Sequence, residues 1–257
     1  MKRILGIALL GFYSSIAPAA VTPPAVLENT KPIDSRGELL PLDTMVVAHD
    51  GQQRALREWV NEDQPLVLTF NYMGCAMLCS LQQDGLARTL SGLELTAGKD
   101  FSVVSVSIDP EETPEMAARA SERLSERIDG EWSVVTASEE AIRTLTDSAG
   151  FRFEYLKSSD QYAHAALTYV LTPEGRVSQY LSGIEPATRD LNFALIEASD
   201  GKIGSFIDQI ALACLQYDST RNSYVTRGVM RAGGVTILAG LGLFLGVLWN
   251  RERSRWS

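Results

Sequence analysis

PLVLTFNYMGCAMLC, residues 65–79, joins an apolar run to a pair of cysteines. Pro65 to Tyr72 is β-rich and has the length of a buried strand. The residues from Cys75 to about Leu90 predict a helix, so both cysteines, Cys75 and Cys79, fall at its start. The positive end of a helix favours a thiolate over a thiol, and residues i and i+4 share one helical face. The stretch therefore predicts a strand–helix unit that carries two reactive thiols.

The elements expected around this unit alternate between strands and helices. Upstream, Met45–Ala48 and Gln52–Leu56 predict two short strands about an Asp-Gly turn, followed by a short helix through Trp59. The downstream elements are a strand at 101–108, a helix at 114–127 capped by Thr113, a strand at 132–136, a helix opened by Ser138, an extended segment at 151–157, a hairpin of 165–172 with 176–181, and a helix at 186–198. This order is the plan of a thioredoxin-like α/β domain with a mixed central sheet, spanning residues 44–200.

Both ends of the chain read as export and membrane signals. Residues 1–19 combine Lys2 and Arg3 with a short apolar run and small residues, as in a signal peptide; an uncleaved anchor is the alternative. Residues 20–43 read as a linker and residues 201–230 as a juxtamembrane segment with a helix at 203–217. The 19 uncharged residues 232–250 predict a transmembrane helix. Residues 251–257 would then form a basic cytoplasmic tail.

This topology places the main domain on the periplasmic, exported side of the inner (plasma) membrane. The net charge of the chain is −9, and removing two positive charges in the first segment and three net from Arg231 and the tail leaves −14 for residues 20–230. So acidic a region is a poor partner for nucleic acid. Metal ions and basic proteins carry the opposite charge and are compatible partners for this region.

A site of thiols and imidazoles can draw on only three cysteines and two histidines. In a thioredoxin-like domain the loop that carries His164 faces the cysteine helix, so Cys75, Cys79 and His164 can converge. Two thiolates and one imidazole suit Cu(I) and Cu(II), and zinc with water as a fourth ligand is the alternative. His49 reads as a turn residue, Met77 as packing and Cys214 as a buried small hydrophobe, with accessory ligation by Met77 or Cys214 left open.

Three motifs in this order resemble the Sco/SenC family of copper chaperones for cytochrome c oxidase assembly. They are the strand followed by CxxxC (Cys75, Cys79), SVSIDPEETPE (105–115) and YAHAALTYVLTPEGRV (162–177). The resemblance implies that Cys75, Cys79 and His164 bind copper. It also implies a role in copper delivery to, or thiol reduction at, subunit II of the oxidase, with other copper chaperones or a thiol reductant as further partners. The chain departs from the family at Ala76, Met77, Ser80 and Ala163, where the family usually has Pro, an acidic residue, Pro and Asp.

Two other functions compete with the copper chaperone. The first is a thiol-disulfide oxidoreductase or thiol peroxidase, in which Cys75 attacks and Cys79 resolves the mixed disulfide or sulfenic acid. Against it, thioredoxin-type reductants have a proline where this chain has His164. The second is an assembly factor in which the cysteines form only a structural disulfide.

Overall fold

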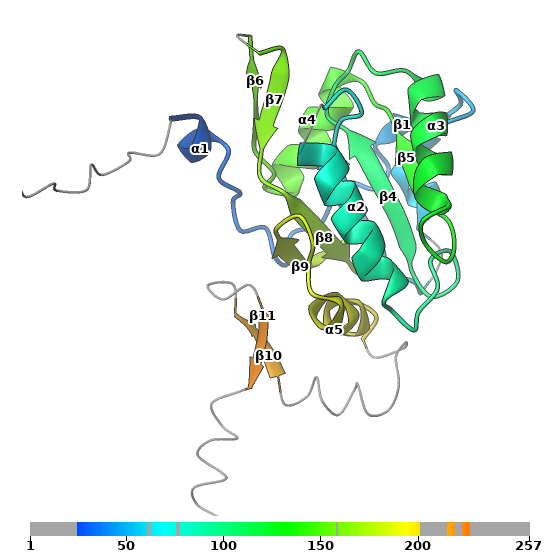
Figure 1. Cartoon of the computed structure of the whole chain (residues 1–257), viewed down its shortest axis with the longest axis vertical. Coiled ribbons are helices and arrows are strands. Elements are labelled where there is room, and N and C mark those ends of the chain that lie inside the picture. The colour runs from blue at the N-terminus through cyan, green and yellow to red at the C-terminus, as the bar shows by residue number, and fades with distance from the viewer. Residues whose placement is uncertain are drawn as a thin grey trace, which may run out of the picture.

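The computed structural model describes residues 25–60, 63–75, 78–157, 159–200, 215–218 and 223–226. A five-stranded sheet in the order β5-β4-β3-β8-β9 forms the centre of the domain (Figure 1). Its strands are β3 (Leu66–Asn71), β4 (Ser102–Ser107), β5 (Ser133–Val135), β8 (Leu167–Leu171) and β9 (Val177–Ser182). β4 runs parallel to β3 and β5, whereas β8 runs antiparallel to β3 and β9. The predicted mixed sheet is confirmed.

Helices cover both faces of this sheet, as the sequence predicted. Side chains alternate along a strand, so Leu66, Leu68 and Phe70 of β3 pack on one face and Val67 packs on the other. On the first face lies α4 (Glu139–Ser148); on the second lie α2 (Leu78–Ser91), α3 (Pro114–Ser125) and α5 (Thr188–Ala198). The result is a three-layer thioredoxin-like domain.

Helices α3 and α4 begin where the sequence placed their caps. The side chain of Thr113 accepts the N–H of Met116, with Pro114 in the first turn of α3. The side chain of Ser138 accepts the N–H of Ala141 in α4. Each cap satisfies a backbone donor that has no partner within its helix, which fixes the start of the helix.

Close packing of α2 depends on Gly85. A Cβ atom at this position would lie 2.1 Å from the carbonyl oxygen of Ile184, which follows β9. The absence of a side chain therefore lets α2 approach the end of the β8–β9 hairpin. This contact fixes the helix that carries Cys79 against the sheet.

The predicted hairpin near the start of the domain is also present. β1 (Met45–Val47) pairs antiparallel with β2 (Gln53–Ala55), and the short 3-10 helix η1 (Leu56–Trp59) follows. His49 is exposed in the turn between the strands, as expected of a turn residue.

A second hairpin was only half anticipated. β6 (Phe153–Leu156) matches the predicted extended segment, but it pairs with β7 (Gln161–His164), where a loop was predicted. The strand predicted at 165–172 spans Leu167–Leu171. This two-stranded sheet is distinct from the central one, and β7 brings His164 to its end.

The expected linker, residues 20–43, is wrong over its later part. A short helix α1 (Ala25–Asn29) is present, and Leu40 and Leu42 are each 1% exposed in the core. The Leu40 N–H donates to the carbonyl of Gly175, and the Val177 N–H donates to that of Glu38. Burial of these leucines and pairing beside β9 make this segment part of the domain.

The predicted helix at 203–217 is wrong at its end. Leu215–Asp218 forms strand β10, which pairs antiparallel with β11 (Ser223–Thr226). Tyr217, Tyr224 and Val225 favour strands, and the polar sequence between the two segments is rich in turn-forming residues. The signal segment 1–19 and the transmembrane segment 232–250 lie outside the described residues. Within the part that is described, no helix is long and apolar enough to cross a membrane.

Candidate metal centre

The two cysteines lie at the start of α2. The helix begins at Leu78, so Cys79 is in its first turn, whereas Cys75 is not helical and the predicted start at Cys75 is corrected. The sulfur of Cys75 accepts the N–H of Cys79 at 3.3 Å. In a longer helix that N–H would bond to the carbonyl of residue 75; here the sulfur takes its place. Both residues are thiols and form no disulfide.

His164 reaches the second cysteine from the end of β7. Its Nε2 atom lies 3.4 Å from the Sγ atom of Cys79. Its Nδ1 atom lies 3.0 Å from the carbonyl oxygen of Ala165, which can only accept, so in the neutral ring Nδ1 carries the proton. The Nε2 lone pair is then directed toward Cys79. Burial lowers the pKa of His164, although the hydrogen bond to Ala165 opposes this shift.

Burial dominates the acidity of the second thiol. Cys79 is 2% exposed, and burial raises its pKa to about 12, while a hydrogen bond with the backbone of Tyr72 acts in the opposite direction. Cys75 is only half-buried. The pair therefore combines an accessible thiol at a helix start with a buried thiol held beside an imidazole.

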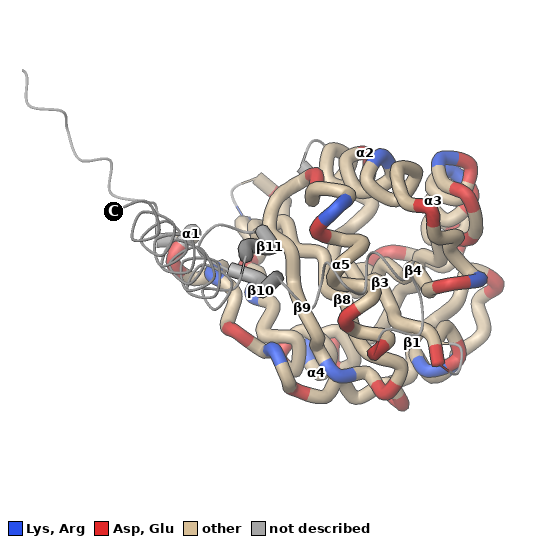
Figure 2. Tube along the Cα trace, turned by 90° about the horizontal axis from the view of Figure 1, so that it is seen from below, with Lys and Arg blue, Asp and Glu red and all other residues tan. Residues whose placement is uncertain are grey.

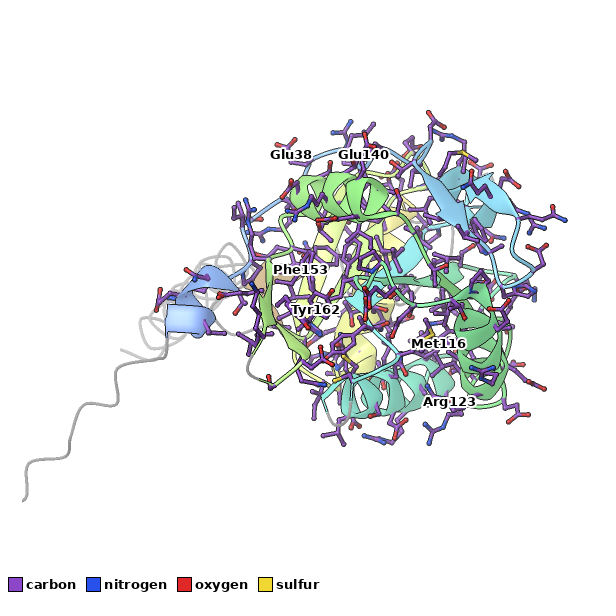
Figure 3. The ribbon with its side chains drawn as sticks, turned by 90° about the horizontal axis from the view of Figure 1, so that it is seen from above. Glu38, Met116, Arg123, Glu140, Phe153 and Tyr162 are labelled. Atoms are coloured by element: carbon purple, nitrogen blue, oxygen red, sulfur yellow. The ribbon has the colours of Figure 1, made fainter. Side chains whose placement is uncertain are left out.

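Aromatic rings surround His164. The ring of Phe151 lies 5.5 Å from the imidazole and that of Tyr72 lies 6.3 Å away, between centroids. Phe153 and Tyr162 point from the β6–β7 hairpin toward the body of the domain (Figure 3). The aromatic residues around His164 were not predicted as part of the site. The alternation of Phe151, Phe153 and Tyr155 nevertheless indicates a strand with one aromatic face.

A buried carboxylate holds the loop that leads to the first cysteine. Glu112 is 8% exposed, and its Oε1 atom accepts the N–H groups of Met73 and Gly74, the latter at 2.7 Å. Its Oε2 atom accepts the hydroxyl of Ser107 at 2.6 Å. Burial raises the pKa of Glu112, and these hydrogen bonds oppose the shift. Glu112 thus anchors the segment before Cys75 to the loop that precedes α3.

Comparison with known proteins identifies the family of this chain. The family model SCO1/SenC matches residues 45–193. The chain belongs to the SCO1/SenC family. Members of this family are copper-binding proteins of cytochrome c oxidase assembly with a thioredoxin-like fold. A search of curated proteins finds no match.

Solved structures agree with membership in the SCO1/SenC family. A candidate electron transfer protein from Aquifex aeolicus VF5 is 26% identical, with a TM-score of 0.58 over 65% of this chain and 96% of its own. BsSco, a Sco protein of cytochrome c oxidase assembly described with a disulfide switch, is 17% identical, with a TM-score of 0.51 over 66% and 98%. Arabidopsis thaliana ScoI, solved with copper bound, is 17% identical, with a TM-score of 0.50 over 64% and 98%. At these lower identities the likeness concerns the fold.

The three predicted ligands of this SCO1/SenC chain are only partly assembled. Cys79 and His164 are in contact, and Cys75 is joined to Cys79 through the helix N–H. Within the described ranges, however, no group of three or more His, Cys, Asp or Glu side chains is arranged to hold a metal ion. The chemistry of the donors, two sulfurs and one imidazole nitrogen, fits copper. Met77 and Cys214 lie outside the described residues.

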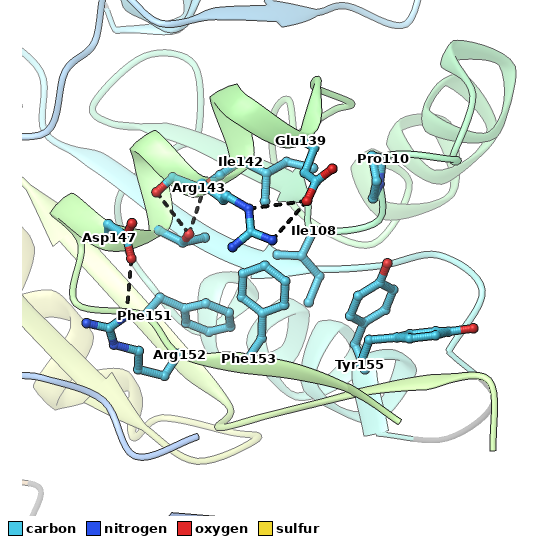
Figure 4. A pocket seen from close by; sticks show the side chains of 12 residues that line it. Ile108, Pro110, Glu139, Ile142, Arg143, Asp147, Phe151, Arg152, Phe153 and Tyr155 are labelled. Carbon is cyan, nitrogen blue, oxygen red and sulfur yellow. Dashed lines mark hydrogen bonds and ion pairs between the residues drawn. The ribbon is translucent and has the colours of Figure 1, made fainter. Parts of the chain in front are cut away.

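Beside the site, this SCO1/SenC domain has a cleft of about 370 Å³ between α4 and the β6–β7 hairpin (Figure 4). Phe151, Phe153 and Tyr155 line one side of it. Arg143 and Arg152 also line it, and each is paired with an acidic residue of α4, Glu139 and Asp147 respectively. The cleft therefore adds an aromatic surface next to the hairpin that carries His164.

Elsewhere, acidic and basic positions are interspersed along the described chain (Figure 2).

Proposed function

We propose that the chain is a membrane-anchored, exported copper chaperone that assists assembly of the copper site of cytochrome c oxidase, with subunit II or a related copper protein as client. Cys75, Cys79 and His164 are the copper ligands in this proposal. The observation that carries it is the 3.4 Å contact between Cys79 Sγ and His164 Nε2. A neutral imidazole with its lone pair facing a thiol is the arrangement that a soft cation needs.

Copper is the cargo of this protein, and its own residues supply the chemistry of loading. Each ligating thiol must lose its proton, since the thiolate is the ligand. His164 needs no deprotonation at neutral pH, because burial lowers its pKa. The Cys79 N–H that Cys75 accepts would also stabilise the Cys75 thiolate as a ligand. A half-buried Cys75 is also the ligand that a client could reach first in an exchange.

Copper-loaded relatives support this proposal. Arabidopsis thaliana ScoI was solved with copper bound, and it shares the fold of this chain. The resemblance of the three motifs assigns the same roles to Cys75, Cys79 and His164. Export and anchoring rest on the sequence of residues 1–19 and 232–250.

The test is an anaerobic Cu(I) competition titration of the full chain in detergent. We expect one Cu(I) per chain. Cys75→Ser, Cys79→Ser and His164→Ala should each weaken binding by more than the roughly 10–100-fold typical of losing an outer partner of a ligand. Cys214→Ser and His49→Ala are the matched controls and should bind as wild type. Wild-type affinity in all three site variants would refute the ligand assignment.

Thiol-disulfide exchange is the second candidate function, and the Cys75 contact favours it. A sulfur that accepts a helix N–H is stabilised as a thiolate, and such a thiolate attacks disulfides. The electrons balance if the reduced pair passes two electrons to a client disulfide and becomes a Cys75–Cys79 disulfide. Trapping a mixed disulfide on Cys75 in a Cys79→Ser variant would show this activity. Full reductase activity in His164→Ala, with no change in copper binding, would favour it over the chaperone.

The membrane topology has its own test. Protease protection in spheroplasts should leave the tail after Arg251 protected and expose residues 44–200, while the chain fractionates with the inner membrane. Deleting residues 232–257 should release the domain into the periplasmic fraction. Recovery of the truncated chain with the membrane, after N-terminal sequencing shows that residues 1–19 have been removed, would contradict the proposed anchor.

A further inference from the structure

Tyr72 lies between β3 and the cysteine loop, and its hydroxyl binds the strand that carries His164. The hydroxyl donates to Oε1 of Gln161 at 2.7 Å. It accepts the N–H of Tyr162 at 3.3 Å. The hydroxyl therefore makes one hydrogen bond as donor and one as acceptor, both to strand β7.

The ring of Tyr72 also contacts this strand. It packs edge-on against Tyr162, with centroids 5.3 Å apart and planes at 71°, and against His164, at 6.3 Å and 70°. Tyr162 and His164 are two residues apart on β7 and thus point to the same side. Tyr72 and Cys79 belong to the same core cluster, and Cys75 packs against this cluster. Tyr72 therefore joins the proposed histidine ligand to the core that holds the cysteines.

Strand β7 lies outside the central sheet. It has four residues and pairs with β6 in a sheet that is separate from the central one. Tyr72 and Cys79 connect β7 to the segment 66–91 by hydrogen bonds. The contact of Cys79 with His164 is the one that copper binding would replace. The bonds of Tyr72 are the ones that can persist with copper bound.

We propose that Tyr72 is a positioning residue that holds His164 against the cysteine pair through its hydroxyl bonds to Gln161 and Tyr162. This inference rests on the proposed function, because it assigns Tyr72 to the same copper site. Tyr72 does not ligate copper in this arrangement. It fixes the position of the His164 imidazole in the copper-free protein.

A merely structural role for Tyr72 makes a different prediction, and Tyr169 is the matched control. Tyr72 is 4% exposed and Tyr169 is 1% exposed. The buried hydroxyl of Tyr169 has no hydrogen-bond partner in the described part of the chain. Tyr169→Phe therefore removes a buried hydroxyl without breaking a hydrogen bond, whereas Tyr72→Phe keeps the ring and breaks those made by its hydroxyl.

The first measurement is made on the copper-free full chain in detergent, with selective histidine labelling. The chain has two histidines, so His49→Ala assigns the imidazole signals of His164. Tyr72→Phe and Gln161→Met should shift or broaden those signals and speed amide exchange at Tyr162 about fivefold, as for loss of one net hydrogen bond. Gln161→Glu keeps an acceptor oxygen and, like Tyr169→Phe, should leave both readouts as in wild type.

The second measurement is Cu(I) affinity in the same variants. Tyr72→Phe and Gln161→Met should weaken binding about fivefold, less than His164→Ala, because the ligand is still present but no longer held. Wild-type imidazole signals and amide exchange in both variants would overturn the proposal. Failure of wild type to bind copper would instead refute the proposed function, and the copper-free signals would still decide the positioning role. If Tyr72→Phe fails to fold, Gln161→Met alone decides, since it changes a half-buried side chain on the hairpin.

Discussion

The Sγ atom of Cys79 lies 3.4 Å from Nε2 of His164, across 85 residues of sequence. The contact joins the first turn of α2 to the end of β7. The carbonyl of Ala165 orients the imidazole through Nδ1, and burial lowers the pKa of His164 and so favours the neutral ring. The contact therefore brings a nitrogen lone pair of His164 and the sulfur of Cys79 together in a buried position.

The first prediction concerns the pH dependence of copper binding. Burial raises the pKa of Cys79 to about 12 and lowers that of His164. Near neutral pH, Cys79 must therefore release a proton when it binds copper, whereas His164 has none to release. We expect the apparent Cu(I) affinity to rise at least about tenfold per pH unit above neutrality. Chelator competition at several pH values, with calorimetry in two buffers, measures this dependence and the proton count.

The matched variant for this prediction is Cys79→Ser. It should bind weakly and lose the proton release that Cys79 contributes. An affinity that does not change with pH in wild type would show that Cys79 is not deprotonated on binding and is not a ligand.

The second prediction concerns the order in which the thiols react. Cys75 is half-buried and its sulfur accepts a helix N–H, whereas Cys79 is 2% exposed with a raised pKa. Iodoacetamide at neutral pH should alkylate Cys75 at least roughly tenfold faster than Cys79, because both thiolate fraction and access favour it. Peptide mass spectrometry of the copper-free chain gives the two rates. Equal rates, with Cys214→Ser as background, would contradict the assignment of Cys75 as the attacking thiol.

The strand–cysteine–helix unit, the mixed sheet and the caps Thr113 and Ser138 were predictable because each rests on local signals: periodicity, capping and turn residues. Strand β7 was not, because its contacts within the described structure are with β6, in a separate sheet, and with Tyr72, and no capping or turn signal marks them. The burial of Leu40 and Leu42 in the core was not predicted for the same reason. Their segment has no periodicity, and only the fold shows that it is buried beside β9.

For the site, the sequence identified the donors but not what holds them. Cys75, Cys79 and His164 stand out because thiols and imidazoles are scarce in this chain. Tyr72 and Glu112 resemble ordinary core and loop residues in a sequence. Glu112 binds Gly74 across 38 residues of sequence, and Tyr72 binds Tyr162 across 90, contacts that no local pattern encodes.

The third prediction concerns stability at alkaline pH. The folded-state pKa of Cys79 is about 12, above the ordinary value of 9.0. The unfolded chain therefore releases this proton first, so the stabilising contribution is complete below pH 9 and is lost as pH rises toward 12. The free energy of unfolding should fall with a slope from this group that grows above pH 9 and approaches about 1.4 kcal/mol per pH unit between the two pKa values.

Urea denaturation of the copper-free chain at pH 8 to about 10 measures this loss. Buried tyrosines also ionise at higher pH, so the relevant quantity is the difference between wild type and Cys79→Ser. The slope should be smaller in Cys79→Ser and unchanged in Cys214→Ser. A Cys79→Ser slope equal to that of wild type would show that the Cys79 thiol is not buried in solution.

The last prediction concerns Glu112 as the support of the cysteine loop. Its carboxylate accepts the N–H groups of Met73 and Gly74 and the hydroxyl of Ser107. Glu112→Ala should cost about 3 kcal/mol of unfolding free energy, because it leaves buried donors without an acceptor. It should also raise the alkylation rate of Cys79, since the segment that leads into the cysteine pair loses its anchor. Denaturation and mass spectrometry on the same samples test both effects.

Two variants separate hydrogen bonding from charge at this position. Glu112→Gln keeps a side-chain oxygen for the loop N–H groups and should retain most of the stability, while it removes a negative charge that contributes, after burial, to the raised pKa of Cys79. Glu111→Ala removes an exposed neighbouring carboxylate and should change neither readout. A Glu112→Ala chain as stable as Glu111→Ala would mean that water replaces the carboxylate at the loop. The cysteine segment would then be positioned by Tyr72 and the helix start, without this buried acid.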